Sequence, residues 1–507
     1  MTTAATSTTP APDERLLEAP IEHGVLSHVE QRGIEPVPAD KRNGTPGQLF
    51  WIWFAANISI LGIPLGATLI ALGLNLWQAV LATAIGAFGS FAVVGVISVA
   101  GRRGGAPSLT LSRAIFGVRG NAGPTLVSLV SRLGWETVTT LTGAFALISL
   151  YSIATGTTAD AKAHPVLTVV CIVIFVALTV VVSATGHSFL LTVQKWATWV
   201  FGALTALVAL YLATTVDWSA FIGNAPGPAS AFVVGIGTIV AGTGVGWANS
   251  GADMARYQKL SVKTRSLVAS ASVGAGIPLV VVIGLGSALT AGNSSIATAS
   301  DPIAAVHQSL PTWVSVPYLI AAFAGLLMSN HISMYSAGLT TITLGVRIRR
   351  VYAVVVDIVV TITGSIYFML ISDSFYGPFI SFISVLAVPI TAWIGCFLVD
   401  MAGRRSYDAH GLLDLRPGAR YWYWHGISLA GTGSWLIGLV VGLLFMSAKI
   451  SDTEVWFAGP LSHTWIGTNG LAWLVSLVVA AGLYALFGGL RRKDDAARHS
   501  PPEPLRE

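Results

Sequence analysis

Long apolar runs separated by short polar connections make up most of this chain. After a polar segment of residues 1–48, twelve runs reach the length that a helix needs to cross a bilayer, about 20 residues. Lipid cannot hydrogen-bond a bare backbone, so each run is expected to be an α-helix. The predicted spans are 49–73, 76–100, 121–153, 165–185, 188–214, 229–249, 266–291, 314–345, 351–372, 377–399, 424–447 and 467–489.

Composition agrees with an integral membrane protein and excludes several other classes. The chain is 53% hydrophobic and 10% charged, whereas soluble domains carry about 25% charged residues. It contains no H-E-x-x-H, Walker or G-x-S-x-G pattern, so neither an enzyme nor a cofactor is expected. Cys171 and Cys396 lie inside apolar runs and are expected to be buried thiols without a disulfide or a metal. The net charge of +5 does not indicate nucleic acid, because the basic residues lie in short connections.

Basic residues gather in alternate connections, and this predicts the orientation by the positive-inside rule. These connections carry Arg102, Arg103, Arg113, Arg119, Arg256, Lys259, Lys263, Arg265, Arg347, Arg349, Arg350, Arg404, Arg405, Arg416, Arg420, Arg491, Arg492 and Lys493. The opposite connections carry Asp160, Asp217, Asp301, Asp373, Asp452 and Glu454, with Lys162 as the clear loop cation. We therefore expect a multi-pass protein of the cell (plasma or inner) membrane with both termini in the cytosol. The expected cytosolic segments are 1–48, 400–423 and 490–507.

Glycine and proline interrupt two of the runs. The first run contains Asn57, Gly62 and Pro64, and the sixth contains Gly244 and Gly246. Matched interruptions in two halves of a core indicate a binding site at the middle of the membrane. Close helix packing through small residues would give the same pattern. The predicted organisation is a core at 49–399, with repeats 49–214 and 229–399, followed by two peripheral helices at 424–489.

Ionisable side chains inside spans are costly in lipid and are therefore candidates for function. Arg132 and Glu136 are four residues apart and can pair along one helix face, either as a structural pair or within a site. Lys195 either extends its ammonium to the cytosolic interface or takes part in coupling.

Three further ionisable groups carry similar alternatives. His331 lies in the middle of the eighth span. Asp253 closes the sixth span, where it can pair with Arg256 at the helix end. Asp357 lies close enough in sequence to Arg347–Arg350 to be an interfacial partner of these arginines.

Several segments, in this order, resemble the nucleobase–cation symporter-1 family, specifically its purine–cytosine permease branch. They are Ile34-Glu-Pro-Val-Pro-Ala-Asp-Lys-Arg42, Trp53-Phe-Ala-Ala-Asn57-Ile-Ser59, Gly134-Trp135, Gly246-Trp247, Ala252-Asp253-Met-Ala-Arg256-Tyr257 and Asn330-His-Ile-Ser-Met-Tyr335-Ser-Ala-Gly338-Leu. Their order and spacing extend the resemblance over essentially the whole chain.

The resemblance implies an all-α membrane fold of twelve helices. Its core would be two inverted five-helix repeats of the LeuT type with helices 1 and 6 discontinuous, and two peripheral helices would complete it. The site would hold a planar heterocycle between Trp135 and Trp247, because flat polar rings stack well on indole. The polar candidates for the ring edge are Ser59, Asn249, Asn330 and Thr139. Gating or structural roles would fall to Asn57, Gly62, Pro64, Gly244, Gly246, Asp253 and Arg256.

The chain departs from the family pattern around the ring. Thr139 stands where the family often has an amide side chain, and Met334 replaces a second expected amide. Glu136, next to Trp135, is a carboxylate not expected there. These changes place cytosine itself in doubt and favour a related heterocycle, either cationic or richer in hydrogen-bond donors.

The nature of the coupled cation follows from the eighth span. Sodium-coupled relatives use two adjacent hydroxyl residues where this chain has Met328-Ser329. A hard cation needs several oxygen ligands, so the thioether favours a co-transported proton over sodium. The coupling candidates are Lys195, Glu136, Asp253, Ser329 and His331. Lys195 is the first choice, with its ammonium in the place that sodium has in relatives.

The function expected from the sequence is secondary active import of a nucleobase or related heterocycle by alternating access. The alternative is a symporter of the same fold for another ring, such as allantoin, a hydantoin or a vitamin-like compound, or for an amino acid. A membrane enzyme, a receptor and a channel rank below these. Expected partners are the small-molecule substrate, a proton and the lipid bilayer, without nucleic acid, in a monomer or weak homo-oligomer.

Overall fold

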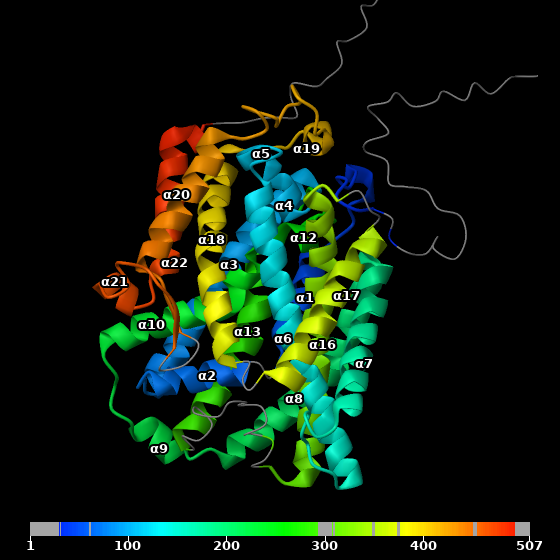
Figure 1. The fold of residues 1–507 in the computed structure, drawn as a ribbon, viewed down its shortest axis with the longest axis vertical. Helices are drawn as coiled ribbons and strands as arrows, with labels where there is room; N and C mark the ends of the chain where they lie inside the picture. The colour runs from blue at the N-terminus through cyan, green and yellow to red at the C-terminus, as the bar shows by residue number, and fades with distance from the viewer. Residues whose placement is uncertain are drawn as a thin grey trace, which may run out of the picture.

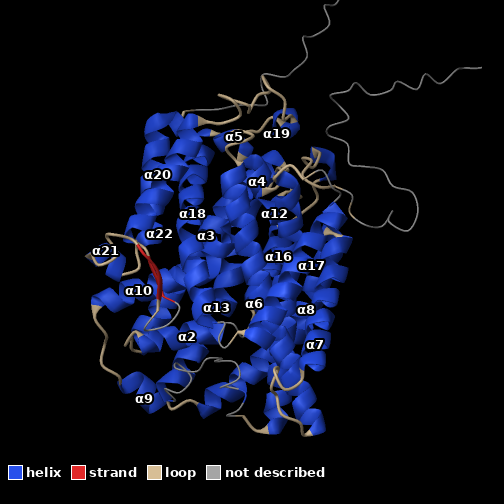
Figure 2. Ribbon diagram, in the orientation of Figure 1, coloured by secondary structure: helices blue, strands red, loops and turns tan. Residues whose placement is uncertain are grey.

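The computed structural model describes residues 30, 32–59, 62–292, 307, 310–346, 350–372, 376–449 and 454–491, and this part of the chain is a bundle of helices (Figures 1 and 2). The tails at 1–29 and 492–507, and the loop residues Asp301, Arg347, Arg349, Asp373 and Asp452, lie outside the described residues.

The α-helices follow one another with short connections. They are α1 (Pro46–Asn57), α2 (Gly62–Ala71), α3 (Leu76–Gly104), α4 (Ser108–Leu111), α5 (Arg113–Phe116), α6 (Ala122–Thr155), α7 (Pro165–Thr185), α8 (His187–Thr215), α9 (Trp218–Gly223), α10 (Ala229–Val240), α11 (Gly246–Ala248), α12 (Gly251–Ala255), α13 (Thr264–Gly292), α16 (Thr312–Thr343), α17 (Arg350–Ile366), α18 (Tyr376–Gly403), α19 (Ala409–Leu413), α20 (Leu429–Phe445), α21 (Trp465–Thr468) and α22 (Ala472–Tyr484). A 3-10 turn, η3 (Ala39–Lys41), precedes them. Three π-helical turns are η4 (Ala241–Val245), η5 (Tyr367–Ile371) and η6 (Ala485–Gly489). Strands β1 (Ser447–Lys449) and β2 (Val455–Ala458) form an antiparallel hairpin with Ser447 opposite Ala458.

Ten helices of the described chain are long and apolar enough to cross a membrane, and the bent pair α1 and α2 makes eleven. The shorter apolar helix α20, of 17 residues, stands where the eleventh span was expected. The spans expected from the apolar runs therefore correspond to helices, while the count of twelve and the inverted repeat stay predictions.

The first span is broken where glycine and proline interrupt it. α1 ends at Asn57, α2 begins at Gly62, and the two helices are bent by 63° (Figure 1). Asn57 Nδ2 donates to the carbonyl of Trp53 at 2.8 Å. The Gly66 carbonyl accepts from Ser287 Oγ of α13 at 3.0 Å, and a Cβ on Gly66 would overlap the backbone of α13. Glycine therefore allows α2 to lie directly on α13.

The sixth span changes its winding instead of bending sharply. α10 continues into the π-helical turn η4 and then into α11, and Asn249 and Ser250 separate α11 from α12. Gly244 N donates to Ser90 Oγ of α3 at 3.2 Å, and a Cβ on Gly244 would overlap Ser90. π-Helical turns leave backbone groups out of the ordinary ladder and are frequent at functional sites.

Helices α20 and α22 pack on α18 at one edge of the bundle (Figure 1). Ser476 Oγ donates to the carbonyl of Val388 at 2.8 Å, and Trp435 Nε1 donates to that of Pro389 at 3.0 Å. The eleventh span begins five residues later than expected, at Leu429 instead of Trp424. The cause is local, because Gly426 has a φ of +88° and Ser428 then caps α20 by accepting from Gly431 N at 3.2 Å.

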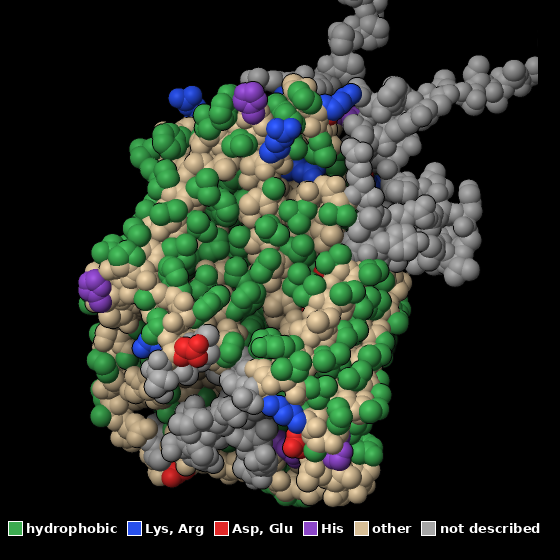
Figure 3. Space-filling model, in the orientation of Figure 1, with side chains coloured by type: hydrophobic (Ala, Val, Ile, Leu, Met, Phe, Trp, Pro, Cys, Tyr) green, Lys and Arg blue, Asp and Glu red, His purple; other side chains and the backbone are tan. Residues whose placement is uncertain are grey.

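Both described chain ends lie at the same end of the bundle, together with α4, α5, α12 and α19 (Figure 1). Val37 N donates to the carbonyl of Gly105 at 2.9 Å, and Arg42 Nη1 donates to that of Arg102 at 2.6 Å. On the face drawn in Figure 3, most Lys and Arg side chains gather at this end, above a broad band of apolar side chains. We call this the basic end.

Candidate substrate-binding site

The indole of Trp135 in α6 approaches the backbone of α11 at Gly246, the residue before Trp247, the second tryptophan expected to clamp a ring. A Cβ on Gly246 would stand 3.3 Å from Nε1 of Trp135, so the absence of a side chain at 246 lets the indole approach the backbone beside Trp247. Both indoles are half-buried. Trp247 packs edge-on against Trp53 of α1, with ring centroids 5.6 Å apart, and Trp135 packs edge-on against Phe379 of α18 at 5.0 Å. One ring pair thus joins the broken first and sixth spans, and a second joins α6 to α18; we call these four rings the aromatic cluster.

Arg132 is the charged group beside Trp247. Its guanidinium carbon lies 4.8 Å from the centre of the Trp247 ring, and Nη2 donates to the Gly246 carbonyl at 2.9 Å and to Asn249 Oδ1. Asn249 Nδ2 in turn donates to Ser128 Oγ at 2.5 Å. A stacked guanidinium of this kind is a planar hydrogen-bond donor held against an aromatic face.

Arg132 and Glu136 do not form the pair that their spacing suggested. Arg132 turns to α11, whereas Glu136 is completely buried and its Oε1 accepts from Ser333 Oγ of α16 at 2.8 Å. The pair predicted from the four-residue spacing does not form, because each side chain is hydrogen-bonded to a different neighbouring helix.

Thr139 and Asn330 are bonded to each other across α6 and α16. Thr139 Oγ1 donates to Asn330 Oδ1 at 2.8 Å, and Asn330 Nδ2 donates to Thr179 Oγ1 of α7 at 3.3 Å. In this conformation the amide joins three helices, so a contact of Asn330 with a ligand would require these bonds to be exchanged. Met334, one turn further along α16, is fully buried.

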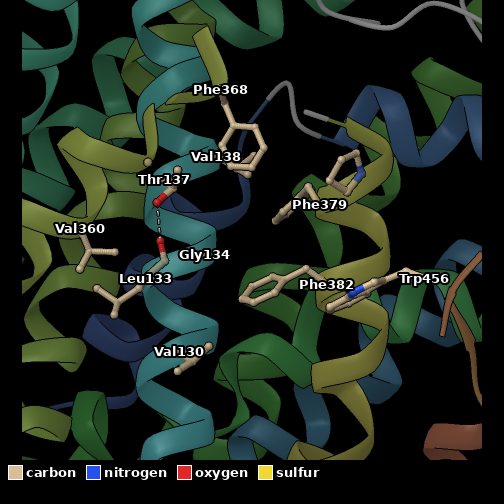
Figure 4. Close-up of a pocket in the computed structure, with 12 residues that line it drawn as sticks. Val130, Leu133, Gly134, Thr137, Val138, Val360, Phe368, Phe379, Phe382 and Trp456 are labelled. Carbon is tan, nitrogen blue, oxygen red and sulfur yellow. Dashed lines mark hydrogen bonds between the residues drawn. The ribbon is translucent and has the colours of Figure 1, made fainter. Parts of the chain in front are cut away.

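An apolar cavity of about 550 Å³ lies beside the aromatic cluster, between α6, α17 and α18 (Figure 4). Its lining residues are Val130, Leu133, Gly134, Thr137, Val138, Val360, Gly364, Phe368, Pro378, Phe379, Phe382 and Trp456. It shares Phe379 with the surroundings of Trp135, so it adjoins the candidate site on the side of α18.

The break in the first span lies against α16, the helix that carries Met328 and Ser329. Sodium-coupled relatives have two hydroxyl residues at this pair. A Cβ on Gly325 would lie 2.9 Å from the carbonyl oxygen of Ile58 and 3.1 Å from the Cα of Ser59. Ser59 is buried and Ser329 is half-buried. The carbonyl of Met328 accepts from Gln194 Nε2 of α8 at 2.7 Å. This neutral amide, not an ammonium, faces the 328–329 pair.

The ammonium of Lys195 therefore does not lie beside Met328 and Ser329, the place that was expected for it. Its side chain is exposed on the outside of α8, with Nζ 6.0 Å from the centre of the Trp196 ring. On a helix, neighbouring residues face different directions, and it is the preceding residue, Gln194, that is buried against α16. His331 is buried in α16. Across the described ranges, no three His, Cys, Asp or Glu side chains are grouped so as to hold a metal.

Asp253 and Arg256 organise the basic end. Asp253 Oδ1 accepts from Ser108 N at 2.7 Å and Oδ2 accepts from Ser336 Oγ at 2.6 Å, which ties α12 to α4 and α16. Arg256 forms its ion pair with Glu30 at 2.8 Å instead of with Asp253.

Three polar groups lie in surroundings that the sequence did not predict. Glu30 lies in a polar tail without periodicity, so nothing in the sequence pairs it with Arg256. Gln194 is a polar residue inside an apolar span, which is a signal for a buried hydrogen bond. The neighbouring Lys195 was considered instead. Asp357 was assigned to an interface with arginines, yet its carboxylate is completely buried.

Comparison with known proteins identifies the family of this chain. The chain matches the family described as "Permease for cytosine/purines, uracil, thiamine, allantoin" over residues 36–482. It is 25% identical to the "Putative purine-cytosine permease YxlA" of Bacillus subtilis (strain 168), over 90% of this chain and 95% of that protein. It is 26% identical to the purine-cytosine permease FCY2 of Saccharomyces cerevisiae, over 81% of this chain and 77% of that one.

A solved structure has the same fold. Mhp1, a nucleobase-cation-symport-1 family transporter in a closed conformation with bromovinylhydantoin bound, superposes with a TM-score of 0.67 at 20% sequence identity, covering 89% of this chain and 93% of Mhp1. The match over residues 36–482 shows that this chain belongs to the family of permeases for cytosine and purines, uracil, thiamine and allantoin.

Proposed function

We propose that this protein is a proton-coupled secondary symporter that imports a nucleobase or a related planar heterocycle by alternating access. The observation that carries the proposal is the approach of the Trp135 indole to Gly246, the residue before Trp247 and directly after the π-helical turn of the sixth span. Two indoles at a broken helix can hold a flat ring by stacking on its faces. Irregular backbone nearby can then satisfy polar atoms at the edge of the ring.

The chemistry of the ring is narrowed by Arg132. Because its guanidinium only donates hydrogen bonds, the edge that faces Arg132 should carry carbonyl oxygens or ring-nitrogen acceptors. Thr139 and Asn330 are bonded to each other, and Met334 offers no polar atom. We therefore favour carbonyl-rich rings, such as uracil, oxidised purines, allantoin or hydantoins, over cytosine and over cationic rings.

Proton coupling is supported by the surroundings of Met328 and Ser329. Gln194 already donates a hydrogen bond to the Met328 carbonyl. The side chain of Met328 has no oxygen that could bind a hard cation. Glu136 is a buried carboxyl beside Trp135 and is suited to carry a proton during the cycle. In our proposal the basic end faces the cytosol, both termini lie there, and the protein resides in the cell membrane as a monomer or weak homo-oligomer.

The test is competition uptake in cells that lack their own nucleobase carriers. Labelled uracil, hypoxanthine, xanthine, cytosine, allantoin and a hydantoin are offered with and without a protonophore. We expect saturable, protonophore-sensitive uptake of a carbonyl-rich ring that Trp247→Ala abolishes. Trp77→Ala serves as the matched control, because this indole is 73% exposed at the start of α3. Uptake of an amino acid instead of any ring would refute the proposal.

A further inference from the structure

The cavity between α6, α17 and α18 has uncharged, apolar walls (Figure 4). Among its described lining residues none is charged, and only Thr137 and Trp456 have a polar side-chain atom. The hydroxyl of Thr137 already donates to the Leu133 carbonyl at 2.8 Å. A space of about 550 Å³ with such walls offers burial to an apolar molecule, but almost no hydrogen bonds to a polar one.

The mouth of the cavity lies on the flank of the bundle. Val130 of α6 and Val360 of α17 line the cavity and are 36% and 39% exposed. One turn before each of them, Leu126 and Val356 are exposed on the same helix faces. Both helices belong to segments long and apolar enough to cross a membrane. Exposed apolar faces of such helices contact lipid chains, so the cavity is continuous with a lipid-facing surface.

The cavity extends from this mouth into the bundle. Gly134 and Val138 follow Val130 along α6 at intervals of four residues, so one helix face passes from exposed to buried. Phe382 of α18 lies against this face, since a Cβ on Gly134 would overlap its ring. The cavity thus leads from the lipid-facing flank to the residue that precedes Trp135.

An acyl chain is the occupant that these walls fit. Apolar walls are stabilised when apolar atoms pack against them, and lipid chains are the apolar molecules that contact the mouth. Because none of the described lining residues is charged, a phosphate or an ammonium group would lose its hydration inside without a counter-charge. The headgroup of a lipid is therefore excluded, whereas its hydrocarbon chain is not.

We propose that this cavity binds one acyl chain of a membrane phospholipid, whose headgroup stays outside. The chain enters between α6 and α17 and packs against Gly134 and Phe382. Phe379 lines the same cavity and packs edge-on against Trp135, with ring centroids 5.0 Å apart. The bound chain thus supports a ring that contacts the candidate substrate site. This lipid site does not depend on which ring or which cation the protein transports.

The test is photolabelling of the purified protein in nanodiscs of phosphatidylcholine that carries a diazirine near the end of one acyl chain. Peptide mass spectrometry locates the adducts, which we expect within 133–138 of α6 and 378–382 of α18. Val360→Trp fills the mouth and should lower this labelling about tenfold, because each methylene group kept out of the cavity loses its burial. Val359→Trp is the matched control, since Val359 is 57% exposed and does not line the cavity.

Three results would refute the proposal. The first is labelling of exposed residues such as Leu126 without any adduct in 133–138 or 378–382, which would show that lipid covers the flank and does not enter. The second is equal labelling of these segments in the wild type and in Val360→Trp. The third is a wild-type dimer that Val360→Trp dissociates, which would assign the cavity to a second copy of the chain.

A titration of the wild type decides the matter if Val360→Trp folds poorly. The protein is held in detergent and the labelled phosphatidylcholine is added in steps. Labelling within 133–138 and 378–382 should saturate, as binding to one site does, whereas labelling at Leu126 should keep rising with the lipid concentration. A proportional rise at all positions would indicate surface contact alone and would overturn the proposal.

Discussion

The guanidinium of Arg256 lies 2.8 Å from the carboxylate of Glu30. This ion pair joins the amino-terminal segment to α12 at the basic end of the bundle. Nη1 of Arg256 donates to the Gly33 carbonyl at 2.5 Å, and Nη2 also donates to the Tyr335 hydroxyl of α16 at 2.8 Å. Glu30 further accepts from the Tyr257 hydroxyl at 2.5 Å. Burial raises the pKa of Tyr257 to about 12, so its hydroxyl remains a donor at neutral pH. The segment thus bridges two helices of the core at this end.

Replacement of Glu30 should weaken this end of the protein. In Glu30→Ala the buried guanidinium of Arg256 loses its carboxylate, at a cost of about 1.5–3 kcal/mol for a hydrogen bond to a charged group. The melting temperature in detergent should fall accordingly. Asp40→Ala is the matched control, because Asp40 is an exposed acid of the same segment. Equal melting of the two variants would show that the pair does not hold the segment.

A methyl group at 246 should disturb the site without changing the fold. In Gly246→Ala the new Cβ would stand 3.3 Å from Nε1 of Trp135, so the indole must shift. We expect KM for the transported ring to rise severalfold at unchanged expression. Gly89→Ala places its methyl in open space on α3 and should leave KM unaltered. If KM is unchanged in both variants, the close approach of Trp135 to Gly246 does not contribute to ligand binding.

Arg132 should be sensitive to shape as well as to charge. Lysine keeps the charge but loses the planar fork that bonds Gly246 and Asn249 while stacking on Trp247. Arg132→Lys is expected to lower the affinity for a carbonyl-rich ring about tenfold, which corresponds to about 1.4 kcal/mol. Direct binding by calorimetry measures this, and the exposed Arg416→Lys provides the control. Wild-type affinity in Arg132→Lys would remove Arg132 from ring recognition.

A buried ion pair at the basic end is expected to serve stability. Arg404 Nε lies 2.6 Å from Asp400 Oδ2 in α18, and the Tyr484 hydroxyl of α22 donates to Asp400 Oδ1 at 2.9 Å. Asp400→Asn should cost about 3–5 kcal/mol, because it leaves a buried guanidinium without its counter-charge. Tyr484→Phe should cost only about 1 kcal/mol, the net worth of one hydrogen bond. Thermal melting compares them, and a reversed order would contradict this assignment.

The sequence predicted the helices and both interruptions well, because hydrophobic length and Gly or Pro breaks are local properties. The break after Asn57 and the π-helical turn at Gly244 fall where those residues interrupt apolar runs. The late start of α20 was missed, because it depends on a left-handed Gly426 and a cap at Ser428.

Side-chain partners were predicted less well, because they depend on which helix lies opposite. The pairing of Arg132 with Glu136 followed from spacing within one helix, yet each side chain is bonded to another helix. Lys195 and Gln194 are adjacent in sequence, and only the packing of α8 on α16 decides that Gln194 is the buried one. Asp357 was assigned to arginines near in sequence, whereas its side chain is completely buried in α17.

The central claim is that a pH gradient drives a planar ring through this protein, and reconstituted transport tests it most directly. Purified wild-type protein in proteoliposomes, acidic outside and sodium-free, should concentrate a labelled carbonyl-rich ring above its external level. A protonophore should abolish the accumulation while counterflow persists. If no ring is concentrated under the pH gradient, and sodium or an amino acid substrate restores accumulation instead, the account is contradicted.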